Sequence, residues 1–174
     1  MKTIGSTIAL CCLLATTTGA GTLSAKEAEN LRADVAAVAA SVERGESGRL
    51  IESTHSSVLN LVGGPEAFAD MTRQAVEQLK QSGVKFLSGE VGTPTRTYSA
   101  GEEEVCFVPR VSVMELQGKK VKSTTFMIAV RTVGGDSWKY LDGAGLRDNP
   151  DLLYQLLPKL ERGVPLPPIN VEVL

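Results

Sequence analysis

Histidine and cysteine are scarce in this sequence. Its 174 residues include one histidine, His55, and 3 cysteines, of which Cys11 and Cys12 lie in an apolar amino-terminal run. A structural zinc site usually takes four nitrogen or sulfur ligands, so the sequence predicts no metal site. If the amino-terminal run is removed, Cys106 remains alone and no intramolecular disulfide can form. Cys106 stands in the apolar run 104–108, which favours a buried, inert thiol over a nucleophile.

Loops that bind phosphate or calcium are also missing. Gly143-Ala-Gly145 follows a predicted strand, but Asp148 occupies the third glycine position of a dinucleotide fingerprint and no parallel strand follows. The acidic run 102–104 lacks the alternating oxygen ligands and the glycine of a calcium loop. We therefore expect no cofactor.

No large excess of positive charge is present. The chain has 18 Lys and Arg against 20 Asp and Glu, a net charge of −2. Proteins that bind nucleic acids or anionic membranes usually carry a basic surface, so neither partner is expected.

The amino-terminal segment has the order of features that a secretory signal peptide needs. Lys2 is followed by an apolar run over residues 4–15 and then by small residues. The run is shorter than the roughly 20 apolar residues that span a bilayer, so no transmembrane anchor is expected. Cleavage is plausible after Ala20 or Ala25, and a helical pattern that starts at Lys26 favours the second. The sequence thus predicts a signal peptide over 1–25 and a periplasmic or secreted protein.

The first half of the remaining chain has helical periodicity. Apolar residues recur at steps of three and four over 26–43, which predicts a helix with one buried stripe. A second helix is predicted over 47–61 and a third from Pro65, which suits a first helical turn, to Gly83.

The second half changes to a period of two. Strands are predicted over 84–91, 105–116, 119–132 and 137–142, with a tight turn at Gln117-Gly118 and Pro109 at an edge or bulge. A short last helix opens at Asn149-Pro150, and a proline-containing tail covers 161–174. Helices followed by an antiparallel meander indicate an α+β fold, with one domain over 26–160.

This layout resembles the nuclear transport factor 2-like superfamily, a cystatin-like cone of three helices packed on a curved antiparallel sheet. The resemblance rests on the two helices around Gly45, the helix over 68–79, and the closing segment 135–143 with Trp138 and Tyr140 before Asp-Gly. It implies a blind pocket in the cone. The superfamily holds isomerases, dehydratases, ring-hydroxylase subunits, transport adaptors and inactive binding domains, so it does not settle activity.

His55 is the main candidate for chemistry in such a pocket. On the second predicted helix it lies at the border of the buried stripe, and it could act as a general base beside a carboxylate. Trp138, Tyr140 and Asp142 alternate onto one face of the last predicted strand. We take His55 and Asp142 as candidate catalytic residues, and His55, Trp138 and Tyr140 as candidate ligand-binding residues. The alternative for each is an ordinary core or rim residue.

The ketosteroid isomerase branch of the superfamily relies on a helical tyrosine that this chain lacks, because no tyrosine precedes Tyr98. The one early candidate base, Asp34, is expected to point outward.

Two functions remain open. The first is a non-catalytic binding module for a small apolar ligand or a partner protein, with a homodimer contact through the sheet face at Val113 and Ile128. The second is a cofactor-independent acid–base enzyme using His55 with Asp142.

Overall fold

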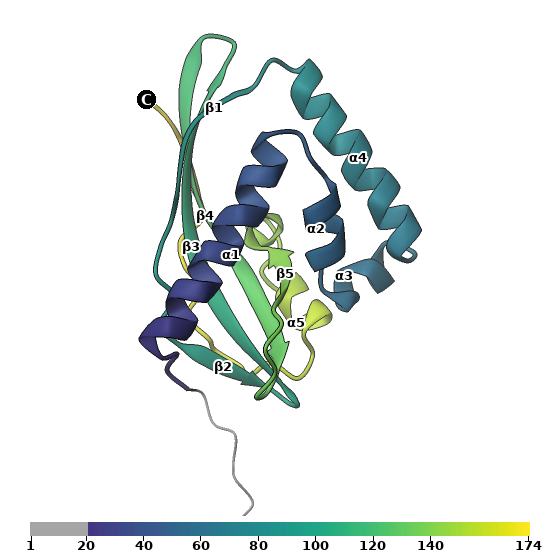
Figure 1. The fold of residues 1–174 in the computed structure, drawn as a ribbon, viewed down its shortest axis with the longest axis vertical. Coiled ribbons are helices and arrows are strands. Elements are labelled where there is room, and N and C mark those ends of the chain that lie inside the picture. Colours follow the sequence, from purple (N-terminus) through teal and green to yellow (C-terminus); the bar gives the residue numbers. More distant parts are fainter. Residues whose placement is uncertain (1–20) are drawn as a thin grey trace, which may run out of the picture.

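The computed structural model describes residues 21–174, so the predicted signal segment up to Ala20 lies outside the described residues (Figure 1). The helices are α1 (Ala25–Glu43), α2 (Gly48–Ser53), α3 (Ser56–Leu61), α4 (Pro65–Gln81), the 3-10 helix η1 (Gly143–Leu146) and α5 (Leu152–Leu156). The strands are β1 (Lys85–Val91), β2 (Thr97–Ala100), β3 (Glu103–Leu116), β4 (Lys119–Thr132), β5 (Lys139–Asp142) and β6 (Asn170–Val173). This is the mixed α+β architecture that the sequence predicts.

The strands form one antiparallel sheet in the order β1-β3-β4-β5. β2 pairs with β3 on the same edge as β1. β6 pairs with β4 on the same edge as β5, nearer the β3–β4 turn. The long β3–β4 hairpin turns at Gln117 and Gly118, both with positive φ, which confirms the predicted tight turn. Pro109 lies between the stretches of β3 that pair with β1 and β2, so its missing N–H interrupts neither ladder.

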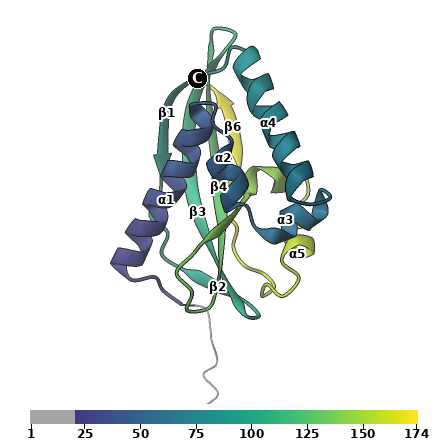
Figure 2. The same cartoon turned by 45° about the vertical axis from the view of Figure 1, so that its right-hand side comes forward.

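Helix α1 crosses one face of this sheet, which we call the front face (Figures 1 and 2). Ser24 caps the helix in a reciprocal capping box with Glu27. The predicted stripe, with Leu31, Val35 and Val38 at its centre, packs on front-face residues of β3 and β4.

The opposite face, the back face, is covered by the C-terminal segment. Leu153, Leu157 and Leu160 are buried there, and parts of the predicted tail pack beside them. Residues 170–173 of that tail form β6. Ile128 is only 1% exposed in this core, so the expectation that it lies on a free sheet face is wrong. Val113 is half-buried further along the same face, and a homodimer there stays a prediction.

The second predicted helix is wrong as a continuous element. Thr54 and His55 have extended backbones that separate α2 from α3. Thr54 forms a parallel bridge with Tyr140 of β5, and the His55 N–H donates to the Tyr140 carbonyl at 2.9 Å. Pairing with the sheet edge therefore overrides the local helical pattern.

No helix among residues 21–174 combines the length and the apolar character needed to cross a membrane.

Candidate functional site

A cavity of about 560 Å³ lies between the helices and the front face of the sheet, and we call it the main cavity. Its walls come from helices α1 to α5 and from strands β1, β3, β4 and β5. Most of its lining is aliphatic or aromatic, including Val42, Leu50, Phe68, Val76, Leu79 and Phe86. Ligand sites in proteins commonly have volumes of roughly 300–1,000 Å³ and this apolar character.

Helix α4 forms the outer wall of the main cavity. It begins at Pro65, whose missing N–H is harmless in the first turn, and it lies against α2 and α3. Phe68, Thr72, Val76 and Leu79 recur at helical spacing and all line the cavity. Thus the apolar stripe of α4 faces this space, while Met71 on the same helix is 55% exposed.

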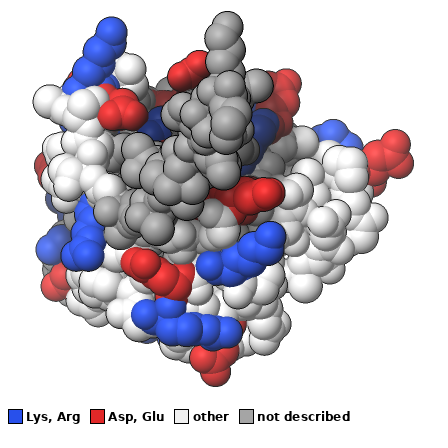
Figure 3. All heavy atoms as spheres, turned by 90° about the horizontal axis from the view of Figure 1, so that it is seen from below, with Lys and Arg blue, Asp and Glu red and all other residues white. Residues whose placement is uncertain are grey.

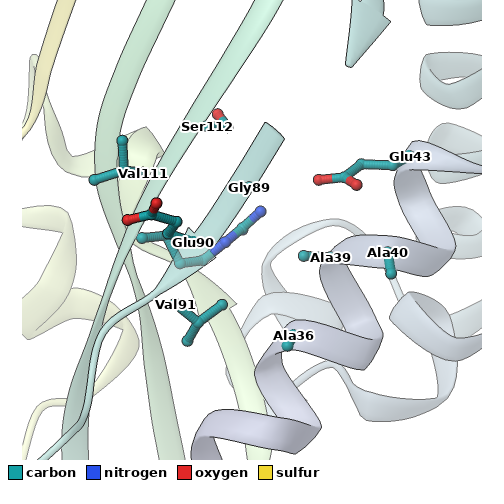
Figure 4. Close-up of a pocket in the computed structure, with 10 residues that line it drawn as sticks. Ala36, Ala39, Ala40, Glu43, Gly89, Glu90, Val91, Val111 and Ser112 are labelled. Carbon is teal, nitrogen blue, oxygen red and sulfur yellow. The ribbon is translucent and has the colours of Figure 1, made fainter. Parts of the chain in front are cut away.

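A smaller groove of about 230 Å³, the side groove, continues from the main cavity toward β1. Figure 4 shows Ala36, Ala39 and Ala40 on α1 facing this strand. Four residues line both spaces: Ala39, Glu43, Arg110 and Ser112. Small side chains on α1 therefore keep the gap between helix and sheet open.

Tyr140 of β5, a predicted ligand-binding residue, is among the residues that line the main cavity. Its hydroxyl donates a hydrogen bond to Asp34 of α1, which also pairs with Arg49 at 2.5 Å. Asp34 therefore points at the sheet edge rather than outward. Burial, and then the bond to Asp34, raise the pKa of the Tyr140 phenol. Tyr140 is thus a protonated, fixed donor in the cavity wall.

His55 does not line the main cavity. It is 7% exposed and serves as the N-cap of α3, where its Nδ1 accepts from the Ser57 N–H at 3.2 Å. Its Nε2 lies 3.2 Å from the Glu103 carboxylate, so the carboxylate beside His55 is Glu103 and not Asp142. With Nδ1 accepting, the proton of the neutral ring sits on Nε2.

Asp142 lines the main cavity at the end of β5. Its carboxylate also accepts from the Ala144 N–H at 2.9 Å and so caps η1. As the sequence predicts, Trp138, Tyr140 and Asp142 lie on the front side of the sheet. Tyr140 and Asp142 line the main cavity, whereas Trp138 lines a separate groove. His55 is separate from all three.

Trp138 lines a third space of about 560 Å³, the polar groove, between α1 and the β4–β5 connection. The Arg131 guanidinium lies 4.3 Å from the centre of its ring. Arg131 also donates to Glu104 at 2.7 Å and to Glu27 at 3.0 Å. Trp138 is therefore part of an ionic network that fixes α1 to the sheet.

Glu27 in this network predicts a loss of stability in acid. Hydrogen bonds from the Ser24 hydroxyl and backbone, and then from Arg131, lower its pKa from 4.5 to about 2. Because the folded-state pKa is depressed, its stabilisation is present above pH 4.5 and is lost as the pH falls toward about 2. Glu27→Gln keeps the capping geometry but cannot titrate, so its unfolding free energy should fall less over this range. Equal pH dependence in urea titrations of both proteins would contradict this.

Cys106 is fully buried against α1, as the sequence predicts. Burial, and then the nearby Glu104, raise the pKa of its thiol to about 12, so it is no nucleophile at neutral pH.

Within residues 21–174, no group of three His, Cys, Asp or Glu side chains is placed to hold a metal ion. Figure 3 shows acidic and basic side chains interspersed on the face seen from below.

Sequence reasoning missed Arg110 and Glu43, the charged residues shared by the main cavity and the side groove. A signal for Arg110 was available, because it follows Cys106 and Val108 at every second position of a predicted strand.

Comparisons with protein-family models, with curated proteins and with solved structures found no match to this chain.

Proposed function

We propose that this protein is an exported binding module that holds a small apolar ligand in the main cavity. The observation that carries the proposal is the cavity itself, about 560 Å³ of apolar-lined space between α4 and the sheet. Small-molecule sites are commonly apolar recesses of this size that lie between secondary-structure elements. Helices lying over one face of an antiparallel sheet also support membership of the nuclear transport factor 2-like superfamily.

The acid–base alternative finds less support in the geometry. A general base must come within hydrogen-bond reach of a substrate proton. His55 is not among the residues that line the cavity, and its Nδ1 is occupied in capping α3. Tyr140 is held as a donor to Asp34. His55 and Tyr140 are thus engaged in structural hydrogen bonds, which favours binding over turnover.

Export by a cleaved signal is the second part of the proposal, and residues 21–24 bear on the cleavage point. Leu23 is buried and its N–H donates to the Thr95 carbonyl at 3.1 Å, while Ser24 caps α1. Cleavage after Ala25 would remove both interactions, whereas cleavage after Ala20 keeps them. We therefore propose a mature chain that starts at Gly21, in a periplasmic or secreted location.

Native mass spectrometry of the protein purified from its own cells without denaturation tests both parts. We expect a chain that starts at Gly21 and carries an extra small-molecule mass, which is lost on unfolding. A chain that starts at Lys26 would overturn the cleavage assignment. A ligand-free mass, together with no binding of apolar fluorescent probes, would overturn the binding function and redirect the search to protein partners.

Matched tryptophan variants locate the binding. Ala39→Trp on α1 and Ala75→Trp on α4 fill the cavity from opposite walls. Ala33→Trp places the same ring on the exposed side of α1 and is the control. We expect both cavity variants to lose the bound mass and to weaken probe binding at least tenfold, with the control unchanged. Equal binding by all three would place the ligand elsewhere.

A further inference from the structure

Arg110 stands where the main cavity and the side groove meet. On β3 it is two residues beyond Val108, which packs against α1, so it faces the same side. Arg110 is half-buried, and its guanidinium carries a charge at all physiological pH values. The residues around it therefore decide what this cavity binds.

The ion pairs among residues 21–174 do not include Arg110. Glu43 and Glu90 line the side groove with it, yet neither comes within the 4.0 Å of an ion pair. Figure 4 shows the Glu43 side chain reaching from α1 toward β1. A Cβ atom on Gly89 of that strand would lie only 3.1 Å from its carboxylate. Across the main cavity, Asp142 is engaged by the Ala144 N–H.

A second polar group beside Arg110 is unsatisfied. Thr125 stands directly opposite Arg110 in the β3–β4 ladder, on the same face. Its Oγ1 is buried and has no hydrogen-bond partner in the described part of the chain. Buried polar atoms nearly always have a partner, so the Thr125 hydroxyl, on the same face as Arg110, is available as a donor there.

We propose that the main cavity binds an amphipathic carboxylate, with its carboxylate on Arg110 and its alkyl chain in the apolar space between α4 and the sheet. This inference rests on the proposed binding function of the cavity. A guanidinium matches the two oxygens of a carboxylate in a bidentate pair, and Thr125 is the cross-strand neighbour of Arg110 on the same face. Glu43 and Asp142 also line the cavity, so a singly charged head group is favoured over a doubly charged one.

Isothermal titration with dodecanoate and dodecanol, below the micelle concentration, separates head group from chain. Arg110→Met should weaken dodecanoate binding about tenfold, as expected for a lost hydrogen bond to a charged group, and leave dodecanol within about twofold. Glu43→Gln removes a like charge and should tighten dodecanoate severalfold. Arg110→Lys keeps the charge without the planar fork and should fall between wild type and Arg110→Met.

The outcomes separate this inference from the proposed function. If both ligands bind and Ala39→Trp abolishes them, but Arg110→Met weakens neither or both alike, the cavity is a neutral apolar site and the carboxylate assignment is overturned. If neither ligand binds the wild-type protein, both proposals fail. Thermal unfolding of each variant shows whether the fold is intact, and Glu43→Gln gives an independent reading if Arg110→Met does not fold.

Discussion

Deletion of residues 161–174 is expected to lower the free energy of unfolding by about 3 kcal/mol or more. Val164, Leu166 and Ile169 pack as half-buried side chains against the back-face core. Full burial of an aliphatic side chain contributes about 1.5–3 kcal/mol, so half burial of three contributes about 3 kcal/mol together. The deletion also removes β6, which pairs with β4 over four residue pairs.

Urea denaturation followed by circular dichroism measures this loss. The control is Val173→Thr, because Val173 is 68% exposed in β6 and threonine keeps the strand preference. We expect the control to change stability by less than about 0.5 kcal/mol. An unchanged midpoint for the deletion would show that the segment is the separate tail that the sequence suggests.

The elements that could be predicted from the sequence are the long ones with a clear composition. β3 and β4 are fourteen residues each and rich in apolar and β-branched residues, and the Gln117-Gly118 turn lies between them. β2 and β6 are four residues each and lie in turn-rich or proline-rich surroundings. Strands this short are defined by their partners in the sheet rather than by their own pattern.

The site was predictable in part, for a similar reason. Tyr140 and Asp142 alternate along β5, and their side of the sheet follows from strand geometry. The position of His55 depends on a backbone bond to Tyr140, 85 residues away, which no local pattern reports. The cavity itself arises because α4 rests on α2 and α3, so the size of the space is set by tertiary packing.

The short segment after β5 predicts the second large effect. Gly143→Ala should lower the free energy of unfolding by about 3 kcal/mol, since the added Cβ would lie 2.6 Å from the backbone oxygen of Phe126 in β4. A backbone atom cannot rotate away, so β5 must move relative to β4. Gly143 directly follows Asp142, and this shift should also disturb the cavity wall.

Gly145→Ala is the matched control, two residues along the same 3-10 helix. No atom lies within 4 Å of a Cβ at Gly145, and its φ is not in the left-handed region. Here the substitution should be neutral or should stabilise by about 0.4–1 kcal/mol, because alanine restricts the unfolded chain. Urea unfolding compares the two variants, and binding of an apolar probe reports on the cavity. If Gly143→Ala were as stable as Gly145→Ala, the close packing of η1 on β4 would be contradicted. If it lost stability but kept full probe binding, the cavity wall would be independent of this contact, and the link from β5 position to ligand binding would fail.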